Sequence, residues 1–136
     1  MNLKVIVTGA SRGIGNSVVN HLIDNKLVKE IHLIASTKKV IEIFNEHSNC
    51  SDIHIIPHIV NFSDSENVIE FCKELKSMKS KPNAIINCAG VLGDHGSFNT
   101  LDYKSYEKVF NINLFAPIML ISALSEDMKS NNFGRI

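Results

Sequence analysis

The sequence predicts an α/β fold in which a doubly wound parallel sheet carries helices on both faces. Short apolar runs, typical of strands buried on both faces, alternate with segments whose apolar residues recur at helical spacing. The first run passes through a glycine-spaced turn directly into a helical segment. The third run contains Pro57, which cannot donate a hydrogen bond to a neighbouring strand and therefore indicates a sheet edge. With the third strand at an edge, the expected strand order is 3-2-1-4.

Four strands are expected where apolar residues form short, nearly continuous runs. They span residues 3–8, 30–36, 52–60 and 83–90. In the predicted order, the ends of the first and fourth strands lie on either side of the point where the strand order reverses. Open α/β sheets bind their ligands at that point, so we expect the binding site at the carboxyl ends of these strands.

Four helices are expected from apolar residues spaced three or four positions apart. The first carries a stripe that consists of Ile14, Val18, Val19, Leu22 and Ile23. A shorter second helix opens with residues 40–44, and a long fourth helix spans about 102–131. Ser63 and Glu66 form a capping-box pattern, which predicts the start of the third helix before an apolar stripe that reaches Met78.

The composition is that of an ordinary soluble globular chain with room for one domain. Its formal net charge of zero argues against nucleic acid as a partner. No apolar run approaches the roughly 20 residues that span a bilayer, and the amino terminus lacks the pattern of a secretion signal. The cysteines Cys50, Cys72 and Cys88 show no CxxC spacing. We therefore expect structural thiols in a reducing compartment, no metal site, and a cytoplasmic location.

The segment "TGASRGIG", from Thr8 to Gly15, lies between the first predicted strand and the first predicted helix. Gly9 permits a tight turn, Gly13 lets a pyrophosphate approach the backbone, and Gly15 lets the helix pack closely on the strand. The helix N-terminus then offers unpaired N–H groups and the positive end of its dipole to the phosphates. The alternative is a glycine-rich turn that binds no ligand.

The spacing of "TGASRGIG" resembles that of the short-chain dehydrogenase/reductase family rather than the GxGxxG of other dehydrogenases. A second motif of that family follows the fourth strand as Asn87-Cys88-Ala89-Gly90, in which Cys88 replaces the usual second asparagine. The resemblance covers essentially the whole chain. It implies a Rossmann-type fold and an oxidoreductase that transfers a hydride between a nicotinamide cofactor and a carbonyl or alcohol substrate.

The expected cofactor is NADP(H) rather than NAD(H). An NAD site usually has an acidic residue about 20 residues past the glycines, at the end of the second strand. Here the segment Ala35–Lys39 has no carboxylate, and its hydroxyl and ammonium groups suit a 2′-phosphate. The resemblance also implies that Arg12 faces this phosphate. Lys38 and Lys39 are alternatively solvated residues at the start of the second helix.

At the end of the third strand the family usually has an Asp and an apolar residue that contact the adenine. This chain has Asn61 and Phe62, of which Asn61 keeps an acceptor oxygen and Phe62 a backbone N–H; alternatively, Asn61 is a plain strand-end residue. The complete set of residues expected to bind the cofactor is Gly9, Ser11, Arg12, Gly13, Ile14, Gly15, Ser36, Thr37, Asn61, Phe62, Asn87, Ala89 and Gly90.

Asn113 matches the catalytic asparagine of the family, within the long fourth helix. Pro117 gives a physical reason to look there, because its ring clashes with the carbonyl four residues earlier and it has no N–H to donate. We expect a kink that frees the Asn113 carbonyl to bind a water. In the family such a water belongs to a proton relay that reaches the catalytic lysine. The alternative is a kink used only for packing.

The serine and the YxxxK motif that complete the family's active site have no counterpart in this chain. Tyr103 and Tyr106 are followed four residues later by Glu107 and Phe110, so both tyrosines are expected to be packing residues. The last residues, "GRI", resemble the opening of a fifth strand. We therefore expect residues 1–136 to be the amino-terminal, cofactor-binding part of a longer enzyme, which is a homo-oligomer in full-length form. The alternative is a shortened, non-catalytic nucleotide-binding or interaction protein.

Two pairs of polar residues carry no expected role. Asp94 and His95 lie in the polar loop after the fourth strand, where single carboxylates and imidazoles are usually solvated. His54 and His58 alternate with isoleucine on the predicted edge strand, and we expect both to face solvent.

Overall fold

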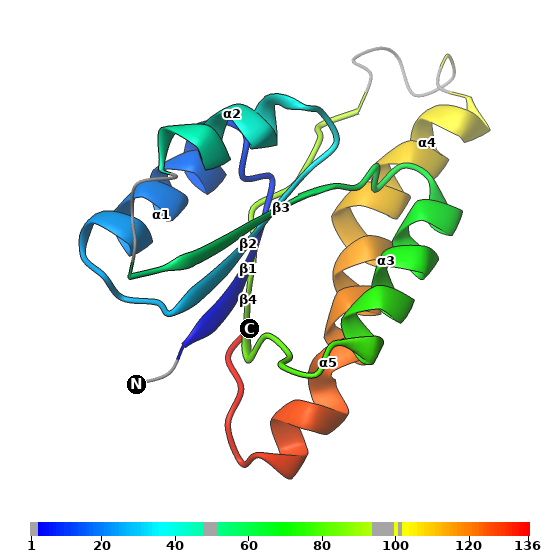
Figure 1. Cartoon of the computed structure of the whole chain (residues 1–136). Helices are drawn as coiled ribbons and strands as arrows, with labels where there is room; N and C mark the ends of the chain where they lie inside the picture. The colour runs from blue at the N-terminus through cyan, green and yellow to red at the C-terminus, as the bar shows by residue number, and fades with distance from the viewer. Residues whose placement is uncertain (1–2, 48–51, 94–99, 101) are drawn as a thin grey trace.

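The computed structural model describes residues 3–47, 52–93, 100 and 102–136. A four-stranded parallel sheet forms the middle layer, with α1 and α2 on one face and α3, α4 and α5 on the other (Figure 1). The strands are β1 (Lys4–Thr8), β2 (Glu30–Ala35), β3 (His54–Ile59) and β4 (Ala84–Asn87). Their order is β3-β2-β1-β4, which confirms the predicted topology and the predicted edge position of the Pro57 strand.

The helices follow the predicted order along the chain. They are α1 (Gly13–Asp24), α2 (Lys39–Glu46), α3 (Ser65–Ser77), α4 (Tyr103–Phe110) and α5 (Ala116–Ser130). Between α4 and α5 the chain forms a π-helical turn, Asn111–Phe115. The segment Tyr103–Ser130 is therefore one continuous helix.

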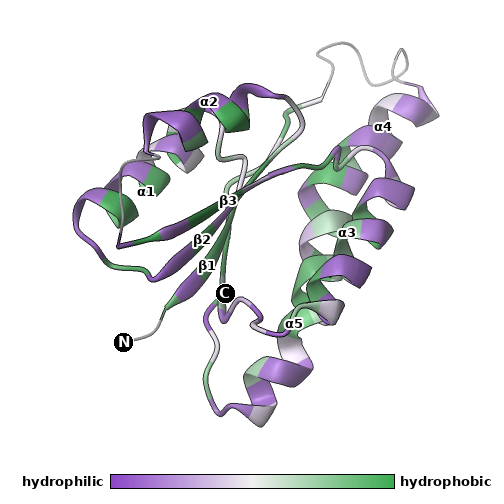
Figure 2. Cartoon of the chain, viewed as in Figure 1, coloured by the Kyte–Doolittle hydropathy of each residue, from purple (hydrophilic) through white to green (hydrophobic). Residues whose placement is uncertain are grey.

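Alternate residues of the strands build two separate cores, because successive side chains of a strand point to opposite faces. On β1, Val5 and Val7 pack with α1 and α2, whereas Ile6 packs with α3 and α5. Figure 2 shows the matching division on the helices, each of which is green along part of its surface and purple along the rest. At the carboxyl ends of the strands the apolar core residues give way to polar residues that line a cavity.

The predicted capping box of α3 is wrong by one residue. Asp64 is the N-cap, and its carboxylate accepts hydrogen bonds from the N–H groups of Glu66 (3.0 Å) and Asn67 (3.4 Å). An aspartate caps as well as a serine and adds a negative charge at the positive helix end. Ser63 is thereby left to bond with Asn61 instead.

At the kink predicted before Pro117 the structure has the π-helical turn. In this turn the Ala116 N–H donates to the Asn111 carbonyl, five residues back, and Pro117 follows in the first turn of α5. Turns of this type are one of the usual places at which helices kink, and their wider hydrogen-bond spacing accommodates a residue that has no N–H to donate.

By length and composition alone, the helix Tyr103–Ser130 is apolar enough to cross a bilayer. The segment contains no continuous apolar run of that length, because Asn111, Asn113 and Ser122 interrupt it. In the fold its buried residues pack against α3 and the sheet, and include Leu120. We therefore assign the helix to the layer that covers one face of the sheet.

The last residues begin to extend the sheet beyond β4. The Ile85 N–H donates to the Arg135 carbonyl (2.9 Å), and the Arg135 N–H donates to the Asn83 carbonyl (3.2 Å). Arg135 thereby forms a parallel bridge with Ala84. Arg135 thus lies where a residue of a fifth strand would pair with β4, and the opening of such a strand at "GRI" stays a prediction.

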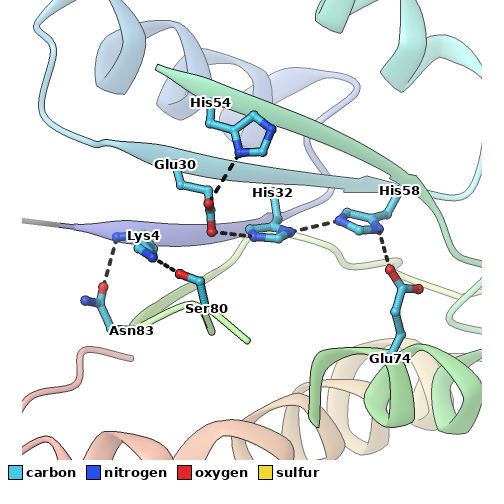
Figure 3. A network of polar contacts seen from close by, with 8 residues as sticks. All are labelled: Lys4, Glu30, His32, His54, His58, Glu74, Ser80 and Asn83. Atoms are coloured by element: carbon cyan, nitrogen blue, oxygen red, sulfur yellow. Dashed lines mark hydrogen bonds and ion pairs between the residues drawn. The ribbon is translucent and has the colours of Figure 1, made fainter. Parts of the chain in front are cut away.

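A row of polar side chains crosses β2 and β3 on the face covered by α3 (Figure 3). His32 is 1% exposed, and its Nδ1 lies 2.9 Å from His58 Nε2. Its Nε2 lies 3.2 Å from a carboxylate oxygen of Glu30. His58 Nδ1 lies 3.8 Å from a carboxylate oxygen of Glu74 on α3. The prediction that His58 faces solvent is therefore wrong, whereas the side chain of His54 is 70% exposed as predicted.

Candidate functional site

A cavity of about 710 Å³ lies at the carboxyl ends of the strands, where the predicted topology places a ligand. Nearly all the residues expected to bind a cofactor line it: Gly9, Ser11, Arg12, Gly13, Ile14, Gly15, Ser36, Asn61, Phe62, Ala89 and Gly90. Thr37 and Asn87 are exposed and do not line the cavity. The cavity thus unites motifs that are about 75 residues apart in the sequence.

The cavity also has lining residues that the sequence analysis missed. They are Ile34, Ala35, Val60, Ser63, Cys88, Val91, Lys108 and Ile112. Most are neighbours of predicted residues at the strand ends. Lys108 and Ile112 instead come from the start of the long helix, and their spacing of four places both on one helix face. That spacing was visible in the sequence, but only the packing of α4 shows that this face meets the cavity.

The glycine turn has the backbone geometry of an anion-binding cradle. Gly9 has a φ of +66°, and a Cβ there would lie 2.8 Å from the Ala89 nitrogen. A Cβ on Gly15 would lie 2.3 Å from the Gly9 carbonyl oxygen, so only glycine permits this approach of helix and strand. Gly13 has a φ of +55° and open space where its Cβ would stand. That open space at the N-terminus of α1 fits a phosphate group.

One predicted residue, Ile14, belongs to the cavity rather than to the core. Its side chain is 78% exposed, whereas Val19 and Ile23 of the same predicted stripe are buried. The predicted apolar stripe is therefore wrong at Ile14, which faces the cavity instead of the core. Ile14 therefore offers an apolar surface to a ligand at the helix N-terminus.

Thr8 joins the two strand ends that flank the cradle. Its Oγ1 accepts hydrogen bonds from the N–H groups of Cys88 and Ala89, each at 3.0 Å. Thr8 is 1% exposed, so these bonds are shielded from water. They tie the end of β1 to the segment after β4, where the second sequence motif lies. Burial raises the pKa of the Cys88 thiol, which keeps it in its protonated, weakly nucleophilic form at neutral pH.

Asn113 holds the π-helical turn against the loop that follows β4. Its Oδ1 accepts from the Val91 N–H (2.9 Å), and its Nδ2 donates to the Val91 carbonyl (2.8 Å). Both polar groups of the side chain are thereby used on one backbone unit. Val91 lines the cavity, so Asn113 stands directly behind its wall. Turns of this π type occur frequently at functional sites.

Comparison with known proteins agrees with this arrangement. Residues 3–136 match a family model described as short chain dehydrogenase. The chain belongs to the short-chain dehydrogenase family. An uncharacterized oxidoreductase of Saccharomyces cerevisiae is 28% identical over 127 residues, which cover 93% of this chain and 36% of that protein. A 3-oxoacyl-(acyl-carrier-protein) reductase of Rickettsia conorii is 28% identical over 131 residues, which cover 96% of this chain and 50% of that reductase.

Solved short-chain dehydrogenases share the fold. One from Sphingobium yanoikuyae, in complex with NADPH, has a TM-score of 0.86 at 19% identity over 97% of this chain and 50% of its own. A metagenomic short-chain oxidoreductase in complex with NADP has a TM-score of 0.85 at 25% identity over 97% of this chain and 58% of its own. The present chain thus spans about half the length of most of the short-chain dehydrogenases that it matches.

The two tyrosines of this chain do not line the cavity. Tyr103 is 78% exposed, so the prediction that it is a packing residue is wrong, whereas Tyr106 is half-buried. Asp94, His95 and Cys50 lie outside the described residues. The part of the site that the structure describes therefore consists of the glycine turn, the ends of the strands and the start of the long helix.

Proposed function

We propose that this chain binds NADP(H) and forms the cofactor half of an oxidoreductase of the short-chain dehydrogenase type. The observation that carries the proposal is the single cavity that joins the glycine cradle, the β2 and β3 ends, and the second motif after β4. Structural relatives with NADPH or NADP bound support the same cofactor class. Bound there, the cofactor supplies the hydride that is exchanged with a carbonyl or alcohol carbon.

The residues of this chain bind and orient the cofactor. The N–H groups at the start of α1 receive the phosphates beside Gly13. Ile14 offers an apolar surface to the dinucleotide. The small residues Ala89 and Gly90 leave room for its nicotinamide half. Asn113 positions the loop after β4 through Val91. We also propose that Asn113 takes part in proton relay through its backbone carbonyl, to which Pro117 cannot donate.

The preference for NADP(H) over NAD(H) follows from the charges at the end of β2. Ser36, at the end of β2, and Arg12, at the start of α1, both line the cavity, and the segment 35–39 contains no carboxylate to bind a ribose 2′-hydroxyl. In calorimetric titrations we expect NADPH to bind at least about tenfold more tightly than NADH. Arg12→Met should remove most of this difference, because it deletes the charge but keeps the length of the side chain.

Arg135→Met is the matched control, since Arg135 lies at the opposite end of the sheet, where its guanidinium donates to the Gly134 carbonyl and lies 4.9 Å from the centre of the Phe133 ring. This variant should keep the preference for NADPH. An affinity for NADH equal to or above that for NADPH in the unchanged protein would contradict the cofactor assignment.

The 136-residue chain is expected to bind the nucleotide without catalysing hydride transfer. The reason is chemical: no Tyr with a lysine four residues later is present to act as a general acid or base. The measurement is the loss of NADPH absorbance with a panel of ketones and aldehydes. Carbonyl reduction by the purified chain would contradict this expectation. A serine and a YxxxK motif in the coding frame after Ile136 would assign hydride transfer to the whole protein; their absence would favour a non-catalytic nucleotide-binding protein.

The remaining assignments are part of the same proposal. We place the protein in the cytoplasm, with a small carbonyl or alcohol compound as the substrate of the whole enzyme and a homo-oligomer as its full-length state. Neither nucleic acid nor a membrane is a proposed partner.

A further inference from the structure

Two segments that follow different strands form part of the cavity wall. Residues 60–63 follow β3, and residues 88–91 follow β4. The two strands are not neighbours, because β2 and β1 lie between them in the sheet. The sheet therefore relates the two segments only through two intervening strands. A ligand that touches both segments needs their separation to be fixed at the strand ends as well.

The π-helical turn between α4 and α5 is bonded to both segments. Ile112 of this turn lines the cavity. The residues before and after it point in different directions, because residues two positions apart lie on nearly opposite sides of a helix. Asn113 bonds to the backbone of Val91 on the β4 side. On the β3 side, Asn111 Nδ2 donates to the Ser63 carbonyl at 3.2 Å.

The turn after β3 is held together by hydrogen bonds of its own. The Asn61 carbonyl accepts from the Asp64 N–H at 3.1 Å. The Asn61 Oδ1 accepts from the N–H (3.1 Å) and the hydroxyl (2.8 Å) of Ser63. The bond from Asn111 is different, because it joins this turn to a helix 48 residues later in the chain. A shift of Ser63 relative to that helix would therefore displace the whole turn.

Apolar packing alone does not fix the position of this turn to the same degree. Phe62 is 5% exposed and packs in the core below the cavity. Apolar contacts are not directional, so they oppose separation of the two elements more than sliding of one along the other. The hydrogen bond from Asn111 is directional and partly buried, and it therefore restrains the sliding as well.

We propose that Asn111 is a positioning residue that sets the separation of the β3 and β4 sides of the cavity, so that one dinucleotide engages both sides at once. The proposal rests on the assignment of this cavity to NADP(H). Without the bond from Asn111, the β3 side must be brought into place during binding, and this ordering uses part of the binding free energy. A ligand that rests on one side alone avoids most of that cost.

The test is a calorimetric titration of the unchanged chain and of Asn111→Leu with NADPH and with adenosine 2′,5′-bisphosphate, which lacks the nicotinamide half. Leucine has a similar size but cannot donate to Ser63. We expect NADPH to bind about tenfold more weakly to the variant. The bisphosphate should stay within about threefold. It rests on the ends of β2 and β3, which remain joined by the bond from the Val60 N–H to the Ala35 carbonyl (2.9 Å).

The decisive quantity is the ratio of the two dissociation constants, bisphosphate over NADPH, which should fall in the variant. A variant that had only lost stability would weaken both ligands by the same factor, because both bind the same folded fraction of the protein. Asn131→Leu is the matched control, since Asn131 Nδ2 also donates to a backbone carbonyl, that of Asp127 at 2.7 Å, outside the cavity. This variant should keep both dissociation constants.

If Asn111→Leu fails to fold, Asn111→Ala replaces it, with the same fall of the ratio expected. A ratio that stays within about twofold of that of the unchanged chain, or that rises, would overturn the inference. If neither ligand binds the unchanged chain, the proposed function itself is overturned, which is a separate result.

Discussion

Gly15→Ala is expected to lower the free energy of unfolding by about 3 kcal/mol and to abolish nucleotide binding. The new methyl group would stand 2.3 Å from the Gly9 carbonyl oxygen and 2.8 Å from its carbon, far inside van der Waals contact. Both atoms belong to the backbone, so no flexible side chain can move away. The strand end and the helix start must separate, which destroys the cradle. Urea unfolding and calorimetric titration with NADPH measure the two effects.

Gly13→Ala is the matched control for this variant. Its methyl group meets no atom within 4 Å, so the only folding cost is the positive φ of +55°, which amounts to about 1–2 kcal/mol. The fold should remain, but the methyl group occupies the space into which a phosphate fits. We therefore expect a folded protein with weakened NADPH binding. A Gly15→Ala protein as stable as Gly13→Ala would contradict the assigned packing role of Gly15.

The glycine cradle and the strand order were predictable because their causes are local. The spacing of Gly9, Gly13 and Gly15 reflects constraints within eight consecutive residues, and the structure places all three as expected. Pro57 placed β3 at the edge through a property of one residue, the lack of an N–H. In such cases a short segment carries the whole physical reason, and no knowledge of packing is needed.

The features that escaped prediction depend on which element packs against which. His58 alternates with isoleucines in a way that suits solvent exposure, yet α3 covers that face of β3. Lys108 belongs to the cavity only because the fold brings the helix α4 beside the strand ends that form the rest of its wall. The capping error at Ser63 has a different cause, since two adjacent residues, Ser63 and Asp64, both suit the N-cap. The hydrogen bonds that the Asp64 carboxylate accepts from the first turn of α3 decide between them, while Ser63 bonds to Asn61.

The second large effect concerns stability toward acid, and its source is the buried pair His32 and His58. Burial favours the neutral form of both rings. Because the Glu30 carboxylate accepts, a neutral His32 carries its proton on Nε2, and its Nδ1 then accepts from His58 Nε2–H. Burial, and secondarily the neighbouring His32, lowers the pKa of His58 from 6.5 to about 4. Burial also lowers the pKa of His32, against the opposing effect of Glu30.

Stability is consequently expected to fall as the pH drops from 6.5 toward 4. In this range the unfolded chain protonates His58 and the folded chain does not, so the unfolded state binds more protons and gains free energy relative to the folded state. The contribution of His58 alone is about 2 kcal/mol between pH 7 and pH 5, and about 3 kcal/mol once the pH is below 4. Urea unfolding at a series of pH values measures it.

His58→Gln isolates this contribution, because the glutamine amide can still donate to His32 Nδ1 but cannot take up a proton. The variant should lose about 2 kcal/mol less stability than the unchanged chain between pH 7 and pH 5. The nearby charges on β2, β3 and α3, namely Glu30, His54 and Glu74, are common to both proteins and cancel in the difference. His21→Gln, on the exposed face of α1, should show the pH dependence of the unchanged chain. If His58→Gln lost stability as steeply as that chain, the acid sensitivity would have to originate outside the histidine pair.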